Sequence, residues 1–191
     1  MGPGSEQAHR TREFETFVAG AAGRLLHAAT LLTAESRTAN PHARALLSAA
    51  LAHTYAVWAR LRDEDPYDLT RRDLAARFAR TAWRHHGGHG PLAALGPQER
   101  LVVVLRLYEG VAEEQVAALL GLSEARVRAV CARSVAALRA AARGAAAASQ
   151  GPGGPGGPGG PGGPGTPGAP GAPGAPGAPG APGAPGRKIA A

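Results

Sequence analysis

The chain has 191 residues, with 21 basic against 14 acidic residues and a net charge of +7 at pH 7. About 40 of these residues form a Gly-, Pro- and Ala-rich C-terminus, so the remainder suffices for one domain or two small ones. The positive charge favours a polyanionic partner, while the absence of a long apolar run and of a leader pattern argues against a membrane span and favours a cytoplasmic protein. The single cysteine, Cys131, excludes an internal disulfide, and neither a metal nor a cofactor is expected.

The first 12 residues are polar and are expected to be flexible. Helical periodicity then predicts a first amphipathic helix over residues 13–33. Its apolar positions are Phe14, Phe17, Ala21, Leu25, Ala28 and Leu32.

Asn40 and Pro41 precede a second predicted helix that ends near Arg62. Its stripe consists of Leu47, Leu51, Thr54, Trp58 and Leu61. Asp65 and Pro66 form a cap and first turn for a third helix, which carries Leu74, Phe78 and Trp83 and runs to about His86. Core packing is favoured over base stacking for both tryptophans.

Residues 87–91 form the clearest internal boundary, because three glycines and a proline in five residues prevent a helix from continuing. The nearby His85, His86 and His89 suggest a metal site or a polar linker, and the linker is favoured because no carboxylate or cysteine partner accompanies them. Asp63, Glu64 and Asp65 are interpreted as a loop and helix cap rather than an acidic site.

A helix starting at Pro97 is predicted, with Leu101, Val104, Leu105 and Tyr108 on one side. The stretch from 111 to 139 then has the spacing of a helix-turn-helix. Gly121 can take a positive φ and end the first helix, and Ser123 can cap the second, with Glu124 in its first turn.

The second helix of this unit has a buried stripe and a basic outer face. The stripe comprises Val127, Cys131, Ser134 or Val135, and Leu138. Arg126, Arg128 and Arg133 lie off the stripe. This pattern predicts a helix whose exposed side meets nucleic acid.

From Gly153 to Lys188 glycine occupies every third position, as in collagen. An unstructured tail rich in polyproline II is favoured, because short Gly-Ala-Pro triplets without hydroxylation make a weak triple helix. A collagen-like oligomerising tail is the alternative.

The segment LGPQERLVVVLRLYEGVAEEQVAALLGLSEARVRAVCARSVAALR, from Leu95 to Arg139, resembles the fourth region of bacterial RNA polymerase sigma factors of the extracytoplasmic-function type. The segment from Phe14 to Trp83 resembles the second region of that family more weakly. The motifs that carry this second resemblance are Leu25-Leu26, Leu31-Leu32-Thr33, Leu51, Tyr55, Trp58, Asp65-Pro66, Arg71-Arg72 and Trp83.

The resemblance implies that the fourth region contacts the upstream promoter element in duplex DNA and that the second region binds core RNA polymerase and opens the downstream element. The implied upstream DNA contacts are Ser123, Glu124, Arg126, Arg128 and Arg133. The implied downstream contacts are Arg71, Arg72, Arg80, Trp83 and Arg84. An anti-sigma protein is a further candidate partner, no membrane partner is expected, and no catalytic motif indicates an enzyme.

The sequence departs from the family in four places, one of which is the loop at Asn40 and Pro41, where about four extra residues replace a usually acidic loop. Residues 45–49, Ala-Leu-Leu-Ser-Ala, replace an acidic, glutamine-containing stretch, which predicts weakened polymerase binding. Ala129 and Val130 stand where polar side chains commonly face DNA. The linker from Arg84 to Leu92 spans at most about 27 Å at ~3.4 Å per residue, whereas the two promoter elements lie more than one DNA turn, ~34 Å, apart.

The sequence therefore predicts an all-α protein with two small helical domains and a disordered tail. The expected boundaries are 1–12 for the flexible N-terminus, 13–86 for the second-region-like domain, 87–91 for the linker, 92–143 for the DNA-binding domain and 144–191 for the tail. The leading hypothesis is a sigma-factor-like transcription protein. The alternatives are a non-initiating regulator derived from a sigma factor and a collagen-like oligomerising protein.

Overall fold

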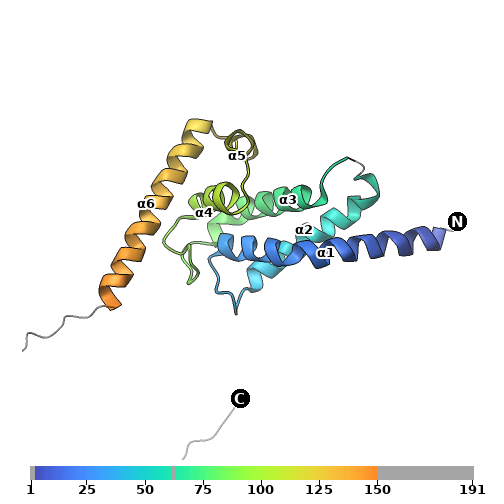
Figure 1. Ribbon diagram of the computed structural model, residues 1–191, viewed down its shortest axis with the longest axis horizontal. Helices are drawn as coiled ribbons and strands as arrows, with labels where there is room; N and C mark the ends of the chain where they lie inside the picture. The colour runs from blue at the N-terminus through green and yellow to red at the C-terminus, as the bar shows by residue number, and fades with distance from the viewer. Residues whose placement is uncertain (1–2, 62, 150–191) are drawn as a thin grey trace, which may run out of the picture. The chain divides into compact units, whose positions relative to one another are not determined.

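A computed structural model describes residues 3–61 and 63–149, and within them every regular element is a helix and no strand occurs (Figure 1). The helices are α1 (Pro3–Thr33), α2 (Pro41–Val57), α3 (Pro66–Thr81), α4 (Pro97–Val103), α5 (Glu113–Leu120) and α6 (Glu124–Ser149). Short 3-10 turns follow α2 at Trp58–Arg60 and α3 at Ala82–Arg84, and a π-helical turn follows α4 at Val104–Tyr108. The predicted all-α class is confirmed, whereas the repeat from Gly153 to Lys188 lies outside the described residues.

The first helix begins at Pro3, so the predicted start at residue 13 is wrong. Polar contacts that apolar periodicity cannot reveal join this early part of α1 to α2. The Gln7 amide donates to the Tyr55 hydroxyl at 3.1 Å, and the Thr11 hydroxyl lies 3.3 Å from the same oxygen. Phe14 continues the contact, since its ring centroid lies 5.2 Å from that of Trp58. Trp58 is half-buried, and its ring centroid also lies 5.4 Å from that of Phe17, so it packs on aromatic side chains of α1.

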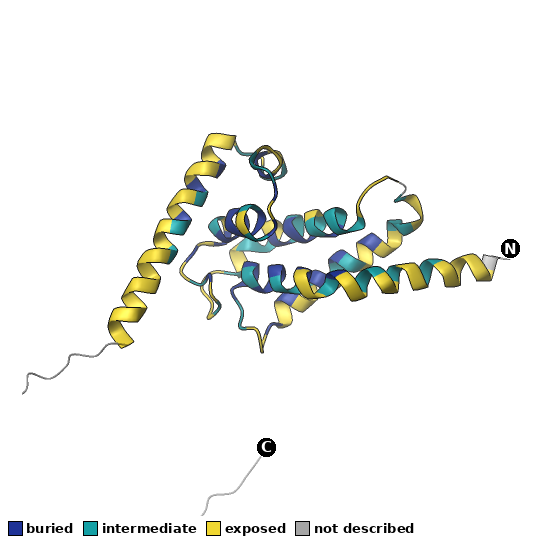
Figure 2. Ribbon diagram, in the orientation of Figure 1, coloured by how far each residue is buried: buried dark blue, intermediate teal, exposed yellow. Residues whose placement is uncertain are grey.

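α1, α2 and α3 pack around a shared core, which Figure 2 shows as the dark faces of these helices. The largest fully buried apolar side chains of this part are Leu25, Leu32, Leu74 and Phe78. Between α2 and α3 the buried hydroxyls of Thr54 and Thr70 lie 2.8 Å apart and satisfy one another. The same core continues into α4 and the helices after it without a break.

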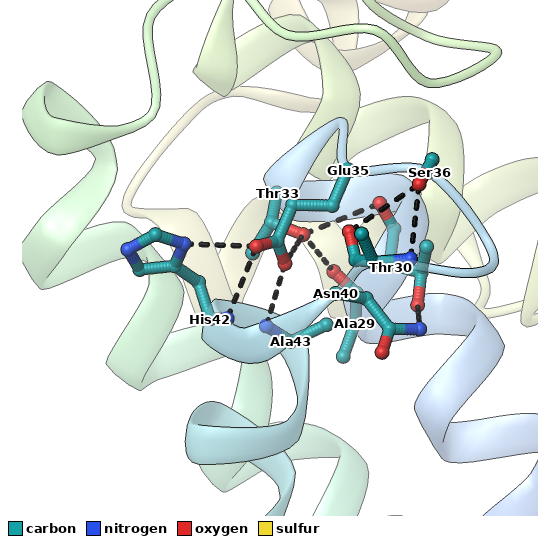
Figure 3. A network of polar contacts seen from close by, with 9 residues as sticks. Ala29, Thr30, Thr33, Glu35, Ser36, Asn40, His42 and Ala43 are labelled. Atoms are coloured by element: carbon teal, nitrogen blue, oxygen red, sulfur yellow. Dashed lines mark hydrogen bonds and ion pairs between the residues drawn. The ribbon is translucent and has the colours of Figure 1, made fainter.

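Glu35 caps the start of α2 (Figure 3). Its carboxylate accepts hydrogen bonds from the backbone N–H groups of Ala43 at 2.8 Å and His42 at 3.1 Å, which have no partner within the helix. The Thr33 hydroxyl also donates to this carboxylate at 2.9 Å, and the Nδ1 atom of the His42 ring lies 2.8 Å from it. Burial alone would raise the pKa of Glu35. The hydrogen bonds together outweigh burial, so the pKa of this carboxyl is lowered from its ordinary value.

In the part of the chain that the structure describes, no helix is long and apolar enough to cross a membrane. α6 continues past the predicted end at residue 143, as far as Ser149. Its alanines favour the helical state without tertiary contacts, which explains why residues 139–149 are helical and exposed.

Candidate nucleic-acid interface

The turn between α5 and α6 has the geometry that the sequence predicts. Gly121 adopts φ 63° and ψ 34°, the left-handed conformation that a residue with a Cβ rarely adopts. The Leu122 amide donates to the Ala117 carbonyl at 2.9 Å, and the Gly121 amide lies 3.5 Å from the Ala118 carbonyl oxygen. These two bonds form a Schellman motif, which ends α5 and turns the chain into α6.

Ser123 caps α6. Its hydroxyl oxygen accepts from the Arg126 amide at 3.3 Å, and its carbonyl accepts from the Val127 amide at 3.0 Å. Glu124 lies in the first turn, where a negative charge is favourable. Both features confirm the predicted start of the second helix.

The inner side of α6 packs against α4 and α5. Val127, Val130 and Ser134 are buried, and Cys131 and Leu138 are partly buried. The expectation that Val130 stands in a DNA-facing position is therefore wrong, because this side chain is 3% exposed. Its burial follows from the i+3 spacing to Val127, which places both on one helix face. Ala129, in contrast, is exposed.

The arginines that are predicted to contact DNA lie on the outer side of α6. Arg126, Arg128 and Arg133 are all exposed, as are Ser123 and Glu124. Arg128 is not free, since its guanidinium donates to the Glu113 carboxylate at 2.6 Å. The Glu113 side chain is 17% exposed against 70% for Arg128, so the arginine is the more solvated partner of this pair. Glu113 is not among the residues predicted from the sequence, although its acidic side chain lies in the first turn of α5.

Two of the candidate downstream contacts are engaged within the protein. The Arg71 side chain is only 14% exposed and lies 3.0 Å from the Asp68 carboxylate. Arg72 is paired with Glu64. Asp65 caps α3 by accepting from the Tyr67 amide at 2.9 Å, which confirms its predicted role as a cap.

The other three candidates, Arg80, Trp83 and Arg84, lie together on the surface at the end of α3. Trp83 is 67% exposed, so its predicted core packing is wrong. The regular helix ends at Thr81, and the 3-10 turn that follows changes the register. His85 stacks on Phe78 instead, with ring centroids 5.3 Å apart, while the Arg84 guanidinium lies 4.8 Å from the Trp83 ring centroid.

The three histidines near the linker, His85, His86 and His89, line one cavity of about 340 Å³. His85 is half-buried, and burial together with the neighbouring His42 and Arg100 lowers its pKa. His86 and His89 are exposed. Within residues 3–61 and 63–149, no group of three or more His, Cys, Asp or Glu side chains is arranged to hold a metal ion.

Of residues 45–49, three lie on the side of α2 that faces the end of α3, whereas Leu47 is buried in the core. Ala45, Leu46 and Ala49 line one wall of a groove of about 440 Å³, and Arg77, Arg80 and Arg84 line the opposite wall. This surface carries arginines and small apolar side chains, and the chain has no acidic side chain at residues 45–49.

One segment of the chain matches a known protein family. Residues 92–140, which begin five residues before α4 and extend through most of α6, match the family described as Sigma-70, region 4. No curated protein and no solved structure matches the chain.

Proposed function

We propose that this protein is a sigma-factor-like transcription protein, in which residues 92–143 bind duplex DNA at an upstream promoter element through the outer face of α6. The observation that carries the proposal is the coincidence of the Sigma-70 region 4 match with an exposed, arginine-bearing second helix in a helix-turn-helix. In this motif the second helix enters the major groove and its N-terminal residues contact base edges.

The chemistry of the outer face supports two kinds of contact. Arg128 and Arg133 can pair with guanine bidentately or bind phosphate. Arg126, Ser123 and Glu124, at the N-terminal end of α6, complete the proposed upstream contacts. Ala129 between them contributes little base recognition, so phosphate binding supplies most of the affinity.

For residues 13–86 we propose a second-region-like domain that contacts core RNA polymerase weakly and presents Arg80, Trp83 and Arg84 to the downstream element. Arg71 and Arg72 belong to the same proposed contact once their intramolecular pairs are released. The weak polymerase contact follows from the apolar stretch 45–49, which lacks acceptors for charge-assisted hydrogen bonds. An anti-sigma protein stays a candidate partner, and the proposed site of action is the cytoplasm.

The alternative is a non-initiating regulator that binds DNA but does not open promoters. Residues 45–49 favour this alternative, because they lack the acidic side chains by which sigma factors are expected to bind polymerase. The collagen-like oligomerising protein differs from both in that a trimer, rather than DNA binding, would carry the function.

The experiment is a titration of the full chain with mixed-sequence duplex DNA at several salt concentrations, followed by fluorescence anisotropy. Arg128→Ala with Arg133→Ala is expected to weaken binding and to reduce the slope of log K against log salt by about 2, since each phosphate contact contributes about 0.9. Arg12→Ala with Arg37→Ala, two exposed arginines of the first half, is the control with the same charge change.

Equal losses in the two double variants would contradict the assignment of α6 and would leave only net charge as the cause of binding. Sedimentation of the same preparations distinguishes the oligomerising alternative, which requires a trimer of the full chain that becomes a monomer when residues 151–191 are removed.

A further inference from the structure

The net positive charge of the chain lies entirely after Glu124, the first residue of α6. Residues 1–124 contain 14 basic and 14 acidic residues, so their charges cancel, whereas residues 125–191 contain seven basic residues and no acidic residue. Five of these seven are arginines of α6. The excess of +7 is therefore concentrated in residues 125–191 and is not spread over the chain.

α6 continues beyond the last side chain that it packs against the other helices. Leu138 is partly buried, and residues 139–149, which we call the α6 extension, are all exposed, as the yellow end of α6 in Figure 2 shows. The Sigma-70 region 4 match ends at residue 140, so nearly all of the extension lies outside it. Because the extension buries nothing, it contributes surface and not core to the protein.

Arg139 and Arg143 are the charged residues of the α6 extension. Among the described residues, neither arginine has an ion-pair or side-chain hydrogen-bond partner, in contrast to Arg128, which pairs with Glu113. The two positions are four residues apart and are neighbours on the helix surface, where like charges repel. An anion that binds both guanidinium groups relieves this repulsion, so the pair favours a polyanionic partner.

These two arginines continue the outer face of α6. Arg139 follows Arg128 after about three helical turns, so the two side chains lie almost in line. Arg143 follows the buried Ser134 after about two and a half turns and therefore lies on the side opposite the buried face. The face that we assign to DNA thus extends as a basic stripe into the α6 extension.

The length of α6 carries this stripe past the major groove. Its 26 residues span about 39 Å at ~1.5 Å per residue, whereas the groove is about 12 Å wide. When residues 123–133 lie in the groove, the extension lies beyond its edge. A cation in that position meets phosphate oxygens and not base edges.

We propose that the α6 extension is a second, sequence-independent phosphate-binding segment, in which Arg139 and Arg143 contact the backbone of duplex DNA beyond the groove that residues 123–133 occupy. The proposal rests on the proposed function for the position of DNA on α6. Such contacts add affinity without base recognition, which offsets the weak base recognition expected at Ala129.

The test is a titration of the full chain with mixed-sequence duplex DNA at several salt concentrations, followed by fluorescence anisotropy. Arg139→Ala with Arg143→Ala should weaken binding about tenfold or more at low salt and reduce the slope of log K against log salt by about 2, since two phosphate contacts are lost. Alanine favours the helix at least as well as arginine, so the extension stays helical. Circular dichroism checks this.

The matched control moves the charges without changing the composition. It combines Arg139→Ala and Arg143→Ala with Ala141→Arg and Ala145→Arg, two exposed positions. Each arginine then lies two residues further along, about 200° around the helix, and faces away from the proposed DNA surface. This charge-moved variant should bind as weakly as Arg139→Ala with Arg143→Ala.

An unchanged affinity and slope in Arg139→Ala with Arg143→Ala would overturn the proposal. Full recovery of binding in the charge-moved variant would also overturn it, because net charge alone would then explain the loss. The variant Arg128→Ala with Arg133→Ala separates this proposal from the proposed function. A reduced slope in that variant alone leaves the proposed function standing without the extension, whereas a reduced slope in the extension variant alone rejects the proposed function and keeps the phosphate contacts of the extension.

Discussion

The Glu113 carboxylate, in the first turn of α5, lies 2.6 Å from the guanidinium of Arg128 on α6. A phosphate that binds Arg128 must compete with this carboxylate. The pair holds the arginine on the surface that we assign to DNA, but it also lowers the charge available there.

We expect Glu113→Gln to tighten duplex DNA binding about two- to fivefold, because an ion pair at the protein surface is worth only about 0.2–1 kcal/mol and its loss frees the exposed cation of Arg128. Glu114→Gln, an exposed neighbour in the same turn, makes the same charge change without breaking the pair. Anisotropy titrations of both variants at one salt concentration check this, and identical gains would attribute the effect to net charge.

Two glycines of the second half should respond oppositely to alanine. Gly121→Ala forces a side chain into the left-handed conformation and should lower the free energy of unfolding by about 1 kcal/mol or more. Gly144→Ala lies inside the exposed helix α6 and should raise helix stability by about 0.5–1 kcal/mol. Urea denaturation and circular dichroism measure the two effects. An unchanged or raised free energy of unfolding in Gly121→Ala would show that the turn does not need glycine.

The regular features of the second half could be predicted from the sequence because they depend on local chemistry. A glycine at the turn, a serine cap and an apolar stripe each act over a few residues. The position of Val130 was predicted wrongly because the buried face of α6 is wide enough to include both Val127 and Val130. The pairing of Arg128 with Glu113 could not be predicted because it depends on how α5 lies against α6.

The first half was predicted less completely, because several of its features are determined by contacts between residues that are distant in the sequence. The start of α1 is extended by bonds from Gln7 and Thr11 to Tyr55, which no periodicity records. Trp83 was assigned to the core on helical spacing, but a 3-10 turn exposes it. The burial of Arg100 and Glu109 runs against the usual exposure of charged residues, so only the folded chain reveals it.

Glu35 should make stability depend on pH in a defined direction. Because its pKa is lowered in the folded chain from the ordinary 4.5, its contribution is fully present above that value and is lost as the pH falls through the folded pKa. Glu35→Gln should cost about 1–3 kcal/mol at pH 7, and its difference from the unmodified chain should shrink below pH 4.5.

Urea denaturation at pH 7 and at successively lower values checks this prediction. Glu15→Gln, an exposed carboxylate of α1, is the control and should show little difference at any pH. A difference that grows toward low pH in Glu35→Gln would contradict the assigned role of the carboxylate as a charged cap.

Polymerase binding should respond to charge at residues 45–49. Ala45→Asp with Ala49→Glu restores acidic side chains on the wall of the groove and should strengthen binding to core polymerase about tenfold or more, since one charge-assisted hydrogen bond contributes about 1.5–3 kcal/mol. Ala45→Asn with Ala49→Gln is the uncharged control. Tight binding and promoter opening by the unmodified chain would show instead that the acidic stretch is dispensable.

The most direct test of DNA binding by the outer face of α6 is a map of backbone amide chemical shifts in the full chain during titration with duplex DNA. We expect the largest changes to fall on residues 123–133 and to diminish as salt is added, because phosphate contacts release counterions. Changes confined to α2 and α3, with residues 123–133 unaffected, would contradict it.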